Sequence, residues 1–142
     1  MANKLHEFIS QIPKSDLHVH LDGSVRIDTL IELSKKQKLS LPSYTTEGLN
    51  KLVFKEQYKN LVEYLQGFAL VLPVMQTQEN LERISYEFAQ DNIKEGVCYT
   101  EVRFAPQLHI NEHENFEQVL LSVNRGLRRA KLEYNKRPDV KA

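Results

Sequence analysis

Residues 14–26 have the sequence KSDLHVHLDGSVR, and this stretch decides which fold the chain is expected to adopt. Polar and apolar residues alternate through it, as on a β-strand whose side chains point to opposite faces in turn. We therefore predict a strand over residues 16–21 and a turn over residues 22–24. One face of this strand is expected to carry four polar side chains: Asp16, His18, His20 and Asp22.

Two imidazoles on one face of a strand can share a metal ion. On a helix, residues two apart diverge by about 200°, so only an extended backbone brings His18 and His20 together. Histidine is a common zinc ligand, and we predict that these two residues bind zinc. The alternative is an exposed amphipathic strand with a polar outer face. A catalytic zinc usually takes three protein ligands, so the pair is an incomplete site in either case.

Beyond this stretch, the sequence pattern predicts several helices and further strands. A second strand is expected over residues 97–105, rich in β-branched and aromatic side chains, and a third is expected to begin within residues 137–142. Apolar residues at helical spacing predict helices over residues 4–11, 25–37, 47–52 (capped by Thr46), from Leu61 onward, from Thr77 to Glu95, and 115–134. Thr77 is the predicted N-cap of its helix, and Gly96 lies where a glycine would end that helix. This order predicts an α/β fold with an unfinished parallel sheet.

The second strand has one polar face, formed by Tyr99, Glu101 and Arg103. Opposite charges two apart on one face can pair with each other or with groups on adjacent strands, and we interpret Glu101 and Arg103 as a structural ion pair rather than as catalytic groups. Cys98 lies on the opposite face and is interpreted as a small buried hydrophobe.

Two more histidines follow the second strand, after Pro106. His109 and His113 are expected on a loop that could approach the site. We interpret both as solvated loop residues, with metal ligation as the alternative.

Composition narrows the class of protein. The chain has 142 residues, with 19 basic and 19 acidic side chains, so its charge predicts neither a nucleic acid nor a membrane partner. Its longest apolar run, FALVLPVM, is far shorter than the ~20 residues that span a bilayer. A single cysteine and a polar amino-terminal segment favour a cytoplasmic protein.

Two motifs together resemble one family. IPKSDLHVHLDGSVR (residues 12–26) is similar to the opening signature of the adenosine deaminase family, and GVCYTEVRFAPQLH (residues 96–109) to its second barrel strand. The helices between them, LVEYLQGFALVLP and LERISYEFAQDNIKEG, match as well, so that the resemblance runs from Leu5 to Ala142.

This resemblance implies a zinc-dependent (β/α)8 TIM barrel that deaminates adenosine, a purine nucleoside, to inosine and ammonia by hydrolysis. It implies that His18 and His20 bind the Zn2+ and that Asp22 contacts the ribose. An apolar helix in the family forms a gate over the purine pocket; the matching substrate-binding positions here are Leu61, Tyr64, Leu65 and Phe68. From the apolar spacing alone, these four residues are interpreted most simply as helix core, with a hydrophobic lid over a flat ligand as the alternative. The positions of Glu101 and Arg103 are structural in that family.

The family's third histidine ligand, glutamate acid/base and paired aspartates come from later strands, in motifs such as His-Ala-Gly-Glu and Thr-Asp-Asp that this sequence lacks. A (β/α)8 barrel typically needs ~250 residues. We therefore interpret residues 1–142 as the N-terminal portion of one barrel domain, with no catalytic residue of its own. We expect it to be inactive alone and to self-associate or pair with the missing C-terminal half.

Several alternatives stay open. The substrate could be adenine, a nucleotide or a modified purine nucleoside instead of adenosine. The chain could be a non-catalytic, truncated zinc- or purine-binding module. An unrelated small α/β domain with a chance His-x-His is the third, and the pairing of two motifs argues against it.

Overall fold

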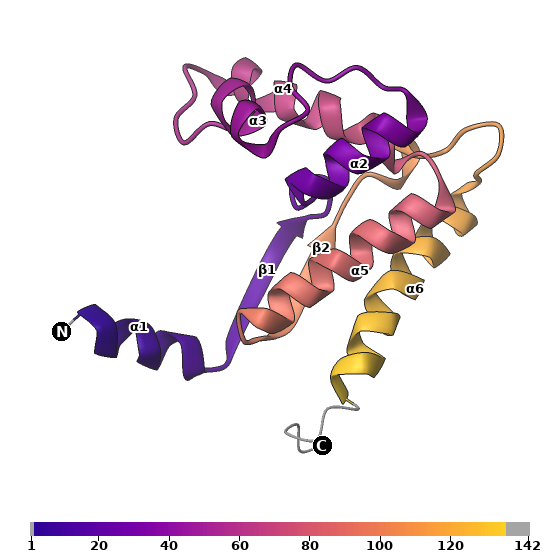
Figure 1. Cartoon of the computed structure of the whole chain (residues 1–142). Helices are drawn as coiled ribbons and strands as arrows, with labels where there is room; N and C mark the ends of the chain where they lie inside the picture. The colour runs from indigo at the N-terminus through magenta and orange to yellow at the C-terminus, as the bar shows by residue number, and fades with distance from the viewer. Residues whose placement is uncertain (1, 136–142) are drawn as a thin grey trace.

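The computed structural model of the chain describes residues 2–135 (Figure 1). Helices and strands alternate in it as the sequence predicted. In chain order the elements are α1 (Ala2–Gln11), β1 (Lys14–His20), α2 (Ile27–Gln37), α3 (Thr46–Leu52), α4 (Leu61–Val71), the 3₁₀ turn η1 (Leu72–Met75), α5 (Gln78–Lys94), β2 (Val97–Arg103), the 3₁₀ turn η2 (Pro106–Leu108) and α6 (Phe116–Asn135). The third strand expected within residues 137–142 lies outside the described residues.

The two strands pair in parallel, as expected for two strands joined by a helical crossover. The register is irregular between Asp16 and Val19, where β1 contains one more residue than β2, and His18 adopts a left-handed φ of 61°. This β-bulge reverses the alternation of side chains. His18 and His20 are exposed, whereas Asp16 pairs with Thr100 on the half-buried face. The prediction that Asp16 shares a face with the two histidines is therefore wrong.

The core lies where α2, α5 and α6 pack beside the sheet. Its most deeply buried side chains include Leu30, Leu81, Ile84, Val119 and Val123. Helices α5 and α6 run side by side (Figure 1). They approach so closely that a Cβ added at Gly126 would lie 2.2 Å from the Glu82 carbonyl oxygen.

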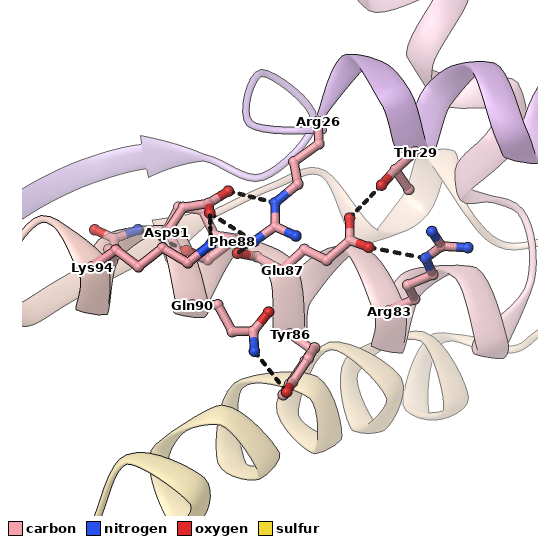
Figure 2. Close-up of polar contacts among 10 residues, drawn as sticks. Arg26, Thr29, Arg83, Tyr86, Glu87, Phe88, Gln90, Asp91 and Lys94 are labelled. Carbon is pink, nitrogen blue, oxygen red and sulfur yellow. Dashed lines mark hydrogen bonds and ion pairs between the residues drawn. The ribbon is translucent and has the colours of Figure 1, made fainter. Parts of the chain in front are cut away.

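Charged side chains bind the start of α2 to α5 (Figure 2). Arg26 donates two hydrogen bonds to Asp91, at 2.8 and 2.6 Å. The hydroxyl of Thr29 donates to Glu87, 2.6 Å away, and Arg83 donates to the other oxygen of the same carboxylate at 2.9 Å. This network fixes the point where the chain leaves β1 and enters α2.

The helix caps in the structure agree with those predicted from the sequence, except that the cap of α3 is one residue earlier. Thr77 accepts from the backbone N–H of Asn80 and caps α5 as predicted. Gly96 ends that helix with a φ of 76°, which glycine adopts without strain. The cap of α3 is Thr45, not Thr46, because the Thr45 hydroxyl accepts from the N–H of Gly48.

Cys98 is exposed, so its interpretation as a buried hydrophobe is wrong. The face of β2 that carries it is only partly covered by the helices, which leaves its side chain open to solvent.

Within residues 2–135, no helix combines the length and the apolar character needed to cross a bilayer.

Candidate active site

The predicted site residues gather at the carboxyl ends of the two strands, the edge of a parallel barrel sheet where active sites form. An open hollow of about 660 Å³ lies between this end of β1 and helix α4. Six of the seven predicted metal- and substrate-binding residues line it: His18, His20, Asp22, Tyr64, Leu65 and Phe68. Leu61, the seventh, is exposed on the first turn of α4 and does not line the hollow. Tyr64 and Leu65 are exposed as well, so the interpretation of these three residues as helix core is wrong.

His18 and His20 stand together on the exposed face of β1, with ring centroids 5.5 Å apart. Two imidazoles on a tetrahedral zinc, each bound at ~2.0–2.1 Å, have centroids roughly 5 Å apart. The pair therefore fits a shared metal ion. Both rings line the hollow, and His18 lies at the bulge of β1.

A third ligand is missing from the described part of the chain. Between residues 2 and 135, no three His, Cys, Asp or Glu side chains lie close enough together to hold a metal. The described residues thus offer two of the three protein ligands that a catalytic zinc usually takes.

Arg103 contacts His18 instead of pairing with Glu101. Its Nη1 atom lies 2.6 Å from Nε2 of His18 and donates a hydrogen bond to the imidazole ring. Glu101 accepts a hydrogen bond from the hydroxyl of Tyr99, 2.9 Å away, which raises the pKa of Tyr99. The predicted Glu101–Arg103 ion pair is therefore wrong: the parallel register places Arg103 opposite His20, within reach of β1. A metal on His18 would compete with Arg103 for the same ring.

Asp22 occupies the turn directly after β1. Its Oδ1 atom is buried and has no hydrogen-bond partner among the described residues. Nδ1 of His20 lies 3.6 Å away, which is beyond hydrogen-bond distance. A buried carboxylate oxygen without a partner is costly, so Asp22 is ready to accept a hydrogen bond from a ligand.

Helix α4 supplies an aromatic wall to the site. The Tyr64 ring packs edge-on against Tyr58, with centroids 5.2 Å apart, and against Phe68, at 5.5 Å. Behind this wall lies a smaller cavity of about 290 Å³ that also reaches Asp22. Its apolar lining includes Phe54 and Tyr58, which sequence reasoning did not assign to the site. The sequence signal that could have identified both residues is an aromatic side chain in the segment directly before an apolar helix.

The two loop histidines differ. His113 is exposed, as predicted. His109 is only 1% exposed, so its interpretation as solvated is wrong. Its Nδ1 lies 3.0 Å from the carbonyl oxygen of Met75, and burial lowers the pKa of His109, an effect opposed by that carbonyl and by the Asp22 carboxylate. Apolar neighbours such as Phe104 account for the burial.

Comparison with known proteins identifies a family. Residues 13–137 match the family described as Adenosine deaminase. The adenosine deaminase of Shewanella pealeana is 51% identical over 126 residues, which are 88% of this chain and 38% of that protein. The adenosine deaminase of Vibrio atlanticus is 47% identical over 124 residues, 87% of this chain and 37% of that protein. The chain thus spans little more than a third of the length of these relatives.

Solved structures place the fold. An amidohydrolase from Burkholderia ambifaria, solved with bound Zn, superposes with a TM-score of 0.72 at 19% identity over 91% of this chain and 35% of that one. Adenine deaminase from Arthrobacter aurescens gives 0.67 at 19% identity, over 86% and 35%. Arabidopsis ADAL complexed with GMP gives 0.62 at 26% identity, over 86% and 36%. The two strands and their crossover are the N-terminal part of a (β/α)8 barrel.

Proposed function

The chain belongs to the adenosine deaminase family, and from that premise we propose that it is the first part of a zinc-dependent enzyme that hydrolyses adenosine to inosine and ammonia. The observation that carries this proposal is the hollow itself. One opening holds two imidazoles placed for a metal, a buried carboxylate oxygen with no hydrogen-bond partner among residues 2–135, and an aromatic wall. Relatives that are about half identical to this chain and named adenosine deaminase support the choice of reaction.

Each group has a distinct role in the proposal. His18 and His20 hold the zinc from β1, and a metal of this kind lowers the pKa of its bound water toward neutrality. Asp22 accepts a hydrogen bond from a ribose hydroxyl, which satisfies its buried oxygen. Tyr64 and Phe68 cover the flat purine with apolar surface.

The substrate is proposed to be a nucleoside because Asp22 offers a hydrogen-bond acceptor beside the aromatic wall. Among structural neighbours, one is an adenine deaminase and another was solved with GMP, so adenine and nucleotides are the competing substrates. The proposal therefore requires turnover of adenosine to exceed turnover of adenine and of AMP.

A chimera tests the proposal. The chain would be joined to the remaining length of the Shewanella pealeana relative, and adenosine turnover followed by the change in ultraviolet absorbance on conversion to inosine. We expect activity from the chimera and none from the 142-residue chain. His18→Ala and His20→Ala should each abolish turnover and lower the bound zinc, whereas His113→Ala, which changes an exposed histidine, should leave both unchanged.

The second candidate is a non-catalytic zinc- or purine-binding module. It is favoured by one observation: the described residues offer no third metal ligand. An inactive chimera whose isolated N-terminal chain still binds zinc or inosine would support this candidate and overturn the first.

We also propose that the isolated chain self-associates or pairs with its missing half. Support comes from the apolar face of α1, where Leu5, Phe8 and Ile9 are all exposed, and from a hollow of about 400 Å³ between β2, α5 and α6. Such surfaces favour association. A monodisperse monomer in multi-angle light scattering would contradict this. The cytoplasmic location stays a prediction from composition.

A further inference from the structure

Helix α4, which walls the candidate site, is held mainly at one end. Among the elements described, it packs extensively only against η1, the turn that directly follows it. Val62 and Leu65 are exposed, and the first half of α4 contacts the loop that precedes it, where Glu63 pairs with Lys55 and Tyr64 packs against Tyr58. The position of α4 over the hollow therefore depends on this loop and on how firmly its C-terminal end is fixed.

That end is fixed from two directions. Val74 and Met75 of η1 are fully buried, and the side chain of Asn80 on α5 donates to the Val74 carbonyl at 2.7 Å. The second direction is the loop after β2. From there the side chain of Asn111 donates to the Gln76 carbonyl, 3.1 Å away.

His109 is the buried member of this loop attachment. A carbonyl oxygen only accepts hydrogen bonds, so the 3.0 Å contact with Met75 places the proton of the ring on Nδ1. Burial lowers the pKa of His109 and favours the neutral ring that makes this bond. The bond joins the loop at the carboxyl end of β2 to the base of the helix that faces β1.

We propose that His109 is a positioning residue, whose Nδ1–H bond to the Met75 carbonyl fixes the base of α4 and thereby the spacing between Tyr64 and Phe68 on one side of the hollow and Asp22 on the other. His109 touches no substrate in this proposal. The proposal rests on the proposed function only for the identity of the ligand in the hollow. The hydrogen bond between His109 and Met75 does not depend on that ligand.

Hydrogen exchange of the 142-residue chain, followed by mass spectrometry, tests the attachment without any activity. His109→Leu keeps the apolar bulk and removes the donor. His109→Asn keeps a donor, because the Asn amide nitrogen matches the position of Nδ1. We expect exchange of residues 61–75 to quicken about tenfold in the leucine variant, as for the loss of one buried hydrogen bond, with residues 78–94 unchanged. The asparagine variant should restore the slow rate.

Two further variants complete the comparison. His109→Gln carries its amide at the Nε2 position and stays polar. It should show the same faster exchange as the leucine variant, and it replaces that variant in the test if His109→Leu fails to fold. His113→Leu changes an exposed histidine four residues away and should leave every rate unchanged. Equal quickening in α4 and α5, no quickening, or failure of asparagine to rescue would each overturn the proposal.

In the active chimera, loss of the attachment should raise KM for adenosine about tenfold and leave kcat nearly unchanged, because a displaced wall weakens binding rather than chemistry. A fall in kcat at constant KM would contradict this. Absence of adenosine turnover in the unmodified chimera would count against the proposed function alone, since the exchange experiment decides the role of His109 independently.

Discussion

Two parts of this molecule use apolar helices in opposite ways. In the body, formed by α2, α5 and α6, apolar side chains are buried and charged ones join the helices. In the arm, defined as residues 46–71 with α3 and α4, the sequence of α4 is more apolar than that of α5, yet much of its surface is exposed. Apolar surface left open beside a hollow indicates a binding surface rather than a core. The hydrophobic pattern of a segment thus predicts that it forms a helix, but not which surface that helix packs against.

The largest difference should appear when one leucine is shortened in each part. Leu81 of the body is fully buried, and Leu81→Ala should lower the free energy of unfolding by about 3 kcal/mol through lost contacts and a residual cavity. Leu65 of the arm is 49% exposed, and Leu65→Ala should cost less than about 1 kcal/mol. Urea unfolding followed by circular dichroism measures both. Equal costs would show that the arm is packed as a core.

Helical glycines give a second comparison. Gly126→Ala would place a methyl group 2.2 Å from a backbone oxygen of α5, and we expect a loss of about 2 kcal/mol despite the better helix propensity of alanine. At Gly67 the nearest atom is the edge of the Phe54 ring at 3.3 Å, which can move. Gly67→Ala should therefore change stability by less than about 0.5 kcal/mol. Thermal melts of the two variants, recorded side by side, would separate the cases.

The charged contacts of the body should matter where they are buried. Glu87 accepts hydrogen bonds from both Thr29 and Arg83, and Glu87→Ala should lower stability by about 2 kcal/mol. Glu79 pairs with Lys36 on the surface, at 3.5 Å, and Glu79→Ala should cost no more than about 0.5 kcal/mol. If high salt weakened the wild-type chain as much as Glu87→Ala does, the network would be a surface effect.

The smallest effect concerns pH at the joint between the two parts. Burial lowers the pKa of His109 below its ordinary value of 6.5. The unfolded chain therefore binds a proton at a higher pH than the folded chain, and this contribution to stability is present above pH 6.5 and lost as pH falls through the lowered pKa. Urea midpoints between about pH 7.5 and 5.5 should decline in the wild type and decline less in His109→Asn. The pKa of Asp91 is also lowered, by its hydrogen bonds from Arg26, so the stability that Asp91 contributes is lost only in more acidic solution.

Much of the fold was predictable because its signals are local. The caps and helix ends depend on side chains within a few residues, such as Thr77 and Gly96, and these predictions were confirmed. The errors lie where a residue's surroundings come from distant parts of the chain. The bulge at His18 moved Asp16 to the other face, Arg103 found a partner on β1, and Met75 gave His109 a buried partner.

By itself, the sequence determined the alternation of helices and strands, the α/β class, and the placement of two histidines on one face of the first strand. These follow from periodicity and residue type, which act over a few residues. Only the tertiary structure decided which polar groups meet: Arg103 with His18, Glu101 with Tyr99, and His109 with the base of α4. The physical reason is that a hydrogen bond requires two groups within about 3 Å, and for residues far apart in the chain that distance is set by packing.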